Sequence, residues 1–73
     1  MFAVVSDGPA GPLVEYVGAT RPTDEQVAEY AGYQTLAEMV ADADSISRDA
    51  QGRIEDVRLA DGDVWYAVRR SVR

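Results

Sequence analysis

The side chains available for chemistry in this chain are carboxylates, tyrosines, serines and arginines, because its 73 residues include no Cys, His or Lys. It therefore has no thiolate or amine nucleophile, no imidazole base and no nitrogen ligand for zinc. A pair of carboxylates would need burial to bring one pKa toward neutral pH, and a domain of this size has little interior to offer. We therefore expect no enzymatic activity and no cofactor.

The acidic segment of residues 42–49 begins with an Asp-x-Asp pattern that is similar to the start of a calcium-binding loop. Three positions break the pattern. Ile46 occupies a position that requires an oxygen ligand, Ser47 occupies the position of the required glycine, and Arg53 occupies the position of the final bidentate glutamate. The sequence therefore predicts no metal site, and a solvated acidic helix end in this segment.

Charge is unevenly distributed along the chain, whose formal net charge is −6. Six carboxylates and no basic residue lie between Pro22 and Ser47, whereas residues 48–73 hold six arginines and five acids. Such an acidic segment repels DNA and RNA phosphates and attracts basic surfaces. We therefore expect it to contact a basic protein partner, and not nucleic acid directly. The candidate contact residues are Glu25, Glu29, Glu38, Asp42 and Asp44.

The single tryptophan, Trp65, and Arg58 are a second pair of candidate contact residues. An arginine over an exposed indole forms a cation–π contact of about 0.5–1 kcal/mol, and both residue types are common interface anchors. Trp65 has two alternative placements. The small size of the domain favours a core position with the N-terminal hairpin folded over it, and the alternative is an interface anchor.

The elements that must position these residues begin with a predicted β-hairpin. Residues 2–6 and 13–17 are apolar runs rich in β-forming residues, and residues 7–12 between them are rich in Gly and Pro. Strict alternation would place Leu13, Glu15 and Val17 on one face and Val14 and Tyr16 on the other.

Two capping boxes, at residues 23–26 and 35–38, predict helices over about 24–31 and 36–43. Gly32 between them is suited to a left-handed helix cap, so we expect two short helices, with one helix kinked at this glycine as the alternative. The apolar residues expected to share a face in the second helical segment are Tyr33, Leu36, Ala37 and Val40.

The C-terminal part predicts an antiparallel meander. Residues 49–52 are typical of a type I turn, and Asp61-Gly62 is typical of a type I′ hairpin turn. This hairpin would carry Val57, Leu59, Val64, Tyr66 and Val68 on a face for the helices to cover, and Asp56, Arg58, Trp65, Ala67 and Arg69 on the other. Together these signals predict one small α+β domain over residues 1–73.

Residues 24–33 resemble the first helix and turn of the helix-turn-helix family, with Val27, Ala28 and Ala31 at the family's apolar positions and Gly32 at the turn. A hairpin after the second helix resembles the wing of winged-helix proteins. The resemblance implies a DNA-binding transcriptional regulator that uses the arginines of the C-terminal hairpin, Arg58, Arg69, Arg70 and Arg73. The acidic second helix departs from the basic recognition helix of that family.

The charge pattern supports a different first hypothesis, a non-enzymatic inhibitor or adaptor that docks its acidic helices on a nucleic-acid-handling protein complex. In its acidic helices the chain is similar to the acidic inhibitors that phages make against host nucleases and defence complexes. The carboxylates of such inhibitors imitate phosphates. A plainer interpretation is that the acidity only confers solubility. Because no signal peptide or membrane span is visible, we expect a cytoplasmic protein without membrane contact, and a homodimer is compatible with the sequence.

Overall fold

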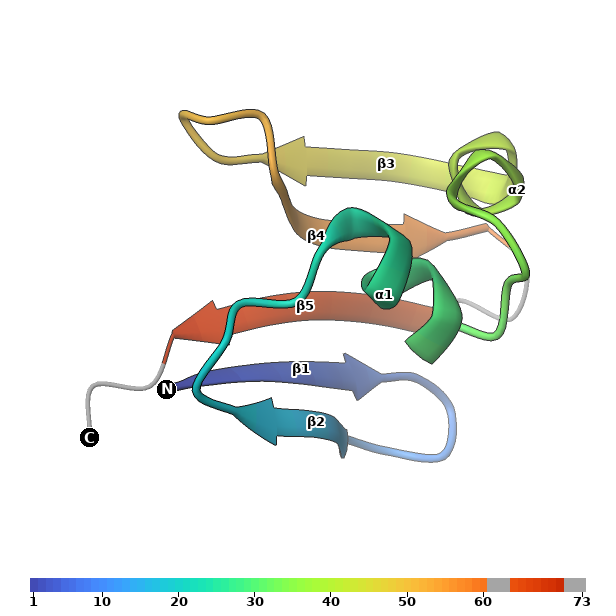
Figure 1. Cartoon of the computed structure of the whole chain (residues 1–73). Coiled ribbons are helices and arrows are strands. Elements are labelled where there is room, and N and C mark those ends of the chain that lie inside the picture. The colour runs from blue at the N-terminus through green and yellow to red at the C-terminus, as the bar shows by residue number, and fades with distance from the viewer. Residues whose placement is uncertain (61–63, 71–73) are drawn as a thin grey trace.

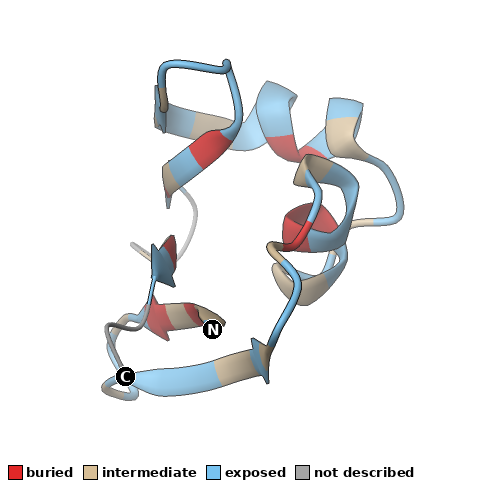
Figure 2. Cartoon of the chain, turned by 60° about the vertical axis from the view of Figure 1, so that its left-hand side comes forward, coloured by how far each residue is buried: buried red, intermediate tan, exposed pale blue. Residues whose placement is uncertain are grey.

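The computed structural model describes residues 1–60 and 64–70. Within those residues the chain forms a five-stranded antiparallel sheet with two helices on one face (Figures 1 and 2). The elements in chain order are β1 (Phe2–Asp7), β2 (Leu13–Gly18), α1 (Asp24–Tyr30), α2 (Leu36–Asp42), β3 (Ala43–Arg48), β4 (Ile54–Leu59) and β5 (Val64–Arg70). The predicted α+β class is therefore confirmed. The predicted Asp61-Gly62 turn and Arg73 lie outside the described residues.

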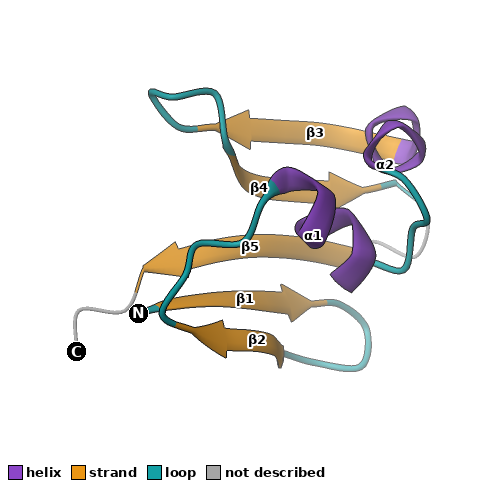
Figure 3. Ribbon diagram, viewed as in Figure 1, coloured by secondary structure: helices purple, strands orange, loops and turns teal. Residues whose placement is uncertain are grey.

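The strand order is β2-β1-β5-β4-β3 (Figure 3). The N-terminal hairpin and the C-terminal meander are therefore joined edge to edge, through the antiparallel pairing of β1 with β5. This arrangement places the first and last strands of the chain next to each other near the centre of one continuous sheet.

Each helix begins at the capping box that the sequence predicts. The Thr23 hydroxyl accepts a hydrogen bond from the Gln26 backbone N–H at 3.1 Å, and the Gln26 side chain accepts one from the Thr23 N–H at 2.9 Å. Thr35 and Glu38 repeat the arrangement at 3.2 and 3.1 Å. Gly32, in the turn between the helices, has a φ of 92°. Two short helices are therefore present, and not one kinked helix.

The register of β4 against β5 agrees with the predicted hairpin. Val57 pairs with Tyr66 and Arg58 pairs with Trp65. Val57 is fully buried, so the helices cover the face that the sequence predicts. The buried positions in Figure 2 lie on both layers, and the core consists of Val4, Val27, Ala28, Met39, Ile54, Val57, Leu59 and Val68.

The expected alternation in β2 is wrong because the strand contains a bulge. Tyr16 pairs with Val4 of β1, and Val14 pairs with the next residue of β1. Glu15 therefore has no residue opposite it in the β1–β2 register. An extra residue in one strand shifts its alternation by one position. Val14 and Val17 therefore share the face that the helices leave open, while Tyr16 packs against the core.

The expected apolar face of α2 is also partly wrong. Met39 is fully buried, whereas Val40 is 42% exposed. Leu36 packs against the core as expected, and it lies three positions before Met39. Residues three apart share a helical face, so a pairing of Leu36 with Met39 turns Val40 toward solvent.

Candidate functional site

The structure places four of the five candidate carboxylates on the helices. Glu25 and Glu29 lie on α1, and Glu38 and Asp42 lie on α2. Asp44 was expected at a helix end but lies in β3, because α2 ends at Asp42 and the strand starts at the following residue. All five residues are exposed. We call these five carboxylates the acidic surface.

The arginines neutralise other carboxylates. Ion pairs join Arg48 to Asp24 at 3.2 Å, Arg53 to Asp49 at 2.9 Å and Arg69 to Asp56 at 3.3 Å. In the part of the chain that the structure describes, no carboxylate of the acidic surface enters an ion pair. The helices and the start of β3 therefore hold five of the exposed carboxylates that enter no ion pair, and Asp7 of β1 and Glu55 of β4 are two others.

Two members of the acidic surface also contribute hydrogen bonds to the fold. Glu38 caps α2 through the backbone N–H of Thr35, and Asp42 accepts a hydrogen bond from the Tyr33 hydroxyl at 3.1 Å. These contacts orient the two side chains without neutralising them. Four of the five carboxylates are thus carried by short, capped helices that are packed on the sheet, and the side chains of Glu38 and Asp42 are held in place by these hydrogen bonds.

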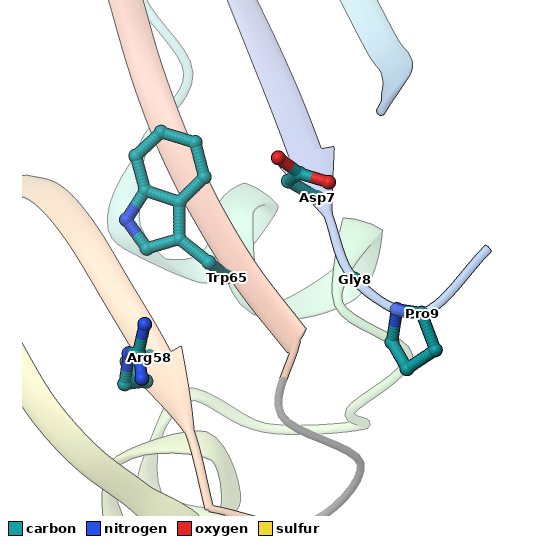
Figure 4. Close-up of a pocket in the computed structure, with 5 residues that line it drawn as sticks. All are labelled: Asp7, Gly8, Pro9, Arg58 and Trp65. Carbon is teal, nitrogen blue, oxygen red and sulfur yellow. The ribbon is translucent and has the colours of Figure 1, made fainter. Parts of the chain in front are cut away.

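Trp65 and Arg58 lie on the opposite face of the sheet. Trp65 of β5 pairs with Arg58 of β4 on one side and with Asp7 of β1 on the other. These three side chains line a shallow pocket of about 450 Å³ together with Gly8 and Pro9 of the β1–β2 loop (Figure 4). Across the three strands, the aromatic residue Trp65 therefore lies between the cationic Arg58 and the anionic Asp7.

The placement of Trp65 differs from the favoured prediction of a core position. Trp65 is half-buried and lies outside the core. The N-terminal hairpin does not fold over it, because β1 pairs beside β5 and extends the sheet. The guanidinium over the indole belongs to Arg69, at 5.0 Å from the ring centroid, although the sequence favoured Arg58. Arg69 is four residues from Trp65 on the same face of β5, and its ion pair with Asp56 holds it there.

The seven candidate contact residues are therefore divided between two faces. The four helix-borne carboxylates of the acidic surface lie on the helix side, Asp44 lies in the edge strand β3, and the pair of Arg58 and Trp65 lies on the open side of the sheet. A single flat partner cannot contact both, so each face must be considered as a separate candidate site.

Among the described residues, no group of three or more Asp or Glu side chains has an arrangement that could hold a metal ion. No helix in residues 1–60 and 64–70 has the length and apolar character needed to cross a membrane.

Comparisons of this chain with protein-family models, curated proteins and solved structures find no match. The functional conclusion therefore depends on the charges and surfaces described above.

Proposed function

We propose that this protein is a non-catalytic binding module, an inhibitor or adaptor that docks its acidic surface on a basic surface of a nucleic-acid-handling protein complex in the cytoplasm. The observation that carries the proposal is the separation of charge in the fold. Arginines pair with Asp24, Asp49 and Asp56. The five carboxylates of the acidic surface stay exposed, without an ion pair in the described residues.

Exposed carboxylates of this kind act mainly at long range. Each exposed ion pair contributes only about 0–1 kcal/mol, but several like charges on one side of a small domain steer it toward a basic surface and raise the association rate. Proteins that bind nucleic acids present arginine and lysine side chains to phosphates, and helix-borne carboxylates offer those side chains the same charge. Added salt should therefore weaken the docking.

Acidity that only confers solubility makes a different prediction. Solubility depends on net charge and not on which carboxylates supply it. Reversal of any two exposed carboxylates should then have equal effects. Docking through the acidic surface requires specific carboxylates, so position distinguishes the two interpretations.

The test is a capture experiment with two charge-matched variants of the full chain. Glu25→Lys/Glu29→Lys changes the acidic surface, and neither side chain caps a helix. Asp7→Lys/Glu55→Lys changes the net charge equally at exposed residues of β1 and β4. From a lysate of the source organism, we expect the immobilised wild type and the second variant to retain the same proteins, and the first variant to lose them. Equal capture by both variants would contradict the proposal.

Competition with duplex DNA adds a second measurement to the same capture. If the acidic surface occupies a nucleic-acid site, DNA should displace the protein from its partner in proportion to the DNA concentration. If captured partners bind DNA and the acidic protein together without competition, the phosphate-imitating form of the proposal is wrong.

The helix-turn-helix alternative is less well supported by the sheet. Strand β5 pairs with both β1 and β4, and β4 also pairs with β3, so the β4–β5 hairpin is interior and does not project as a wing. A DNA reader should still bind duplex DNA more strongly after Glu38→Lys/Asp42→Lys/Asp44→Lys and more weakly after Arg69→Ala/Arg70→Ala. Fluorescence anisotropy with a labelled duplex measures both effects.

A further inference from the structure

Strand β2 is an edge of the sheet whose large apolar side chains are exposed. Leu13, Val14 and Val17 are 59%, 64% and 60% exposed. Among the described residues the strand pairs only with β1, so its outer edge is open to another strand. Such an edge is a template for pairing with a second chain.

The two edges of the sheet are protected differently. Strand β3 exposes Asp44 and Arg48, and charged residues on an edge oppose strand pairing. The only charged residue of β2 is Glu15, whose carboxylate accepts a hydrogen bond from the Ser6 hydroxyl at 2.9 Å. Ser6 is buried, so this contact turns Glu15 inward. Edge β2 therefore lacks the charge that protects edge β3.

The bulge at Glu15 gives edge β2 an apolar surface on one face. Because of the bulge, Val14 and Val17 share the open face, where they pair with Val5 and Ala3 of β1. The four side chains form an apolar strip over β1 and β2. Trp65, Arg58 and Arg69 lie on the same face but farther from the edge, over β4 and β5.

The distribution of charge indicates where two copies of this chain can approach each other. The chain has a net charge of −6, so two copies repel each other most where their acidic surfaces meet. Edge β2 and the apolar strip contain no charged residue other than the inward-turned Glu15. This part of the described surface can meet its own copy with little direct repulsion, whereas a basic partner is drawn to the helices.

The sequence of β2 is also complementary to itself. In an antiparallel pair of two β2 strands centred between Glu15 and Tyr16, Val14 lies opposite Val17 of the second copy, and Val17 lies opposite Val14 of the second copy. Both strands contain the same bulge, so all four valines point to the same open face. A two-fold axis thus buries one patch of each chain against the identical patch of the other.

We infer that this protein forms a homodimer through antiparallel pairing of β2 with β2 of a second copy. The sheet then continues through both copies, with both acidic surfaces on the same side. Both surfaces stay accessible, so the dimer presents two docking sites and gains avidity for a partner with a repeated basic surface. The dimer does not require the proposed function.

The test is sedimentation equilibrium of the full chain from about 1 µM to about 1 mM, a range that brackets weak dimers. We expect a concentration-dependent dimer that becomes tighter between about 0.05 M and about 0.5 M salt, because salt screens the repulsion between two acidic chains. Docking to a basic partner should become weaker over the same range. The opposite salt dependences separate failure of this inference from failure of the proposed function.

Variants locate the interface. Val17→Lys should raise the dimer Kd by at least about tenfold, because it places a charge on the paired edge. Val40→Lys is the matched control, since Val40 is also an exposed valine but lies on α2. Circular dichroism melts establish that both variants are folded. A monomer at every concentration and salt, or equal effects of the two variants, would overturn the inference.

Discussion

Asp24 Oδ1 accepts a hydrogen bond from the backbone N–H of Ile54 at 2.9 Å, across 30 positions of sequence. Its Oδ2 pairs with Arg48 at 3.2 Å. Asp24 is the first residue of α1 and Ile54 is the first residue of β4, so one carboxylate connects the helix layer to the sheet. This inward role distinguishes Asp24 from the carboxylates that form the acidic surface.

Removal of the Asp24 carboxylate should destabilise the fold without affecting the acidic surface. Asp24→Ala leaves the backbone N–H of Ile54 without its acceptor in a residue that is 1% exposed, at an expected cost of about 1–3 kcal/mol. Asp24→Asn keeps an acceptor and should cost less. Urea denaturation measures both, with Glu25→Ala as the exposed neighbour, expected within about 0.5 kcal/mol of wild type. Equal losses for Asp24→Ala and Glu25→Ala would show that this connection is unimportant.

Asp49 makes the stability sensitive to acid. It accepts hydrogen bonds from the backbone N–H groups of Gln51 and Arg53 and from the Arg53 side chain, each at 2.9 Å. The backbone hydrogen bond from Arg53 contributes most to lowering the pKa of Asp49 below its ordinary value of 3.8, and burial opposes it.

A lowered folded-state pKa stabilises the protein above the unfolded-state pKa, and this contribution is lost as the pH falls through the folded-state value. The Tm of the wild type should therefore fall more steeply below about pH 4 than the Tm of Asp49→Asn. Thermal melts followed by circular dichroism measure this difference. Parallel acid profiles for the two proteins would contradict the role of the Asp49 charge.

Tyr66 makes the stability sensitive to alkali. Burial raises the pKa of Tyr66 above its ordinary value of 10.0, and the Glu15 carboxylate adds to the effect. The unfolded chain then releases the Tyr66 proton before the folded chain does, so stability is lost as the pH rises above about 10. Tyr66→Phe should lose less stability than wild type between about pH 8 and about pH 10.5 in chemical denaturation. A wild-type loss no larger than that of the variant would contradict this assignment.

Local signals in the sequence predicted the helices and the β4–β5 register. Thr23 and Thr35 each bond to a residue three positions later, so the information that starts each helix lies within four residues. The pairing of Val57 with Tyr66 agrees with the alternation of apolar and polar residues on either side of the Asp61-Gly62 sequence signal. These features need no knowledge of the rest of the chain.

The features that the sequence could not predict depend on distant contacts. Trp65 stays uncovered because β1 pairs with β5 and extends the sheet, which joins the two ends of the chain and keeps the N-terminal hairpin from folding over the indole. The inward turn of Glu15 depends on Ser6 in the neighbouring strand. No pattern within a few residues encodes either contact, so the uncovered indole of Trp65 and the exposed edge at Val17 became visible only in the fold.

The most direct test of docking through the acidic surface is the Kd of the captured complex, measured by interferometry for the two charge-matched double variants. For Glu25→Lys/Glu29→Lys we predict a Kd raised by at least about tenfold, mainly through slower association, while Asp7→Lys/Glu55→Lys stays within about twofold of wild type. Equal increases in Kd for the two variants would show that net charge, and not the acidic surface, determines binding.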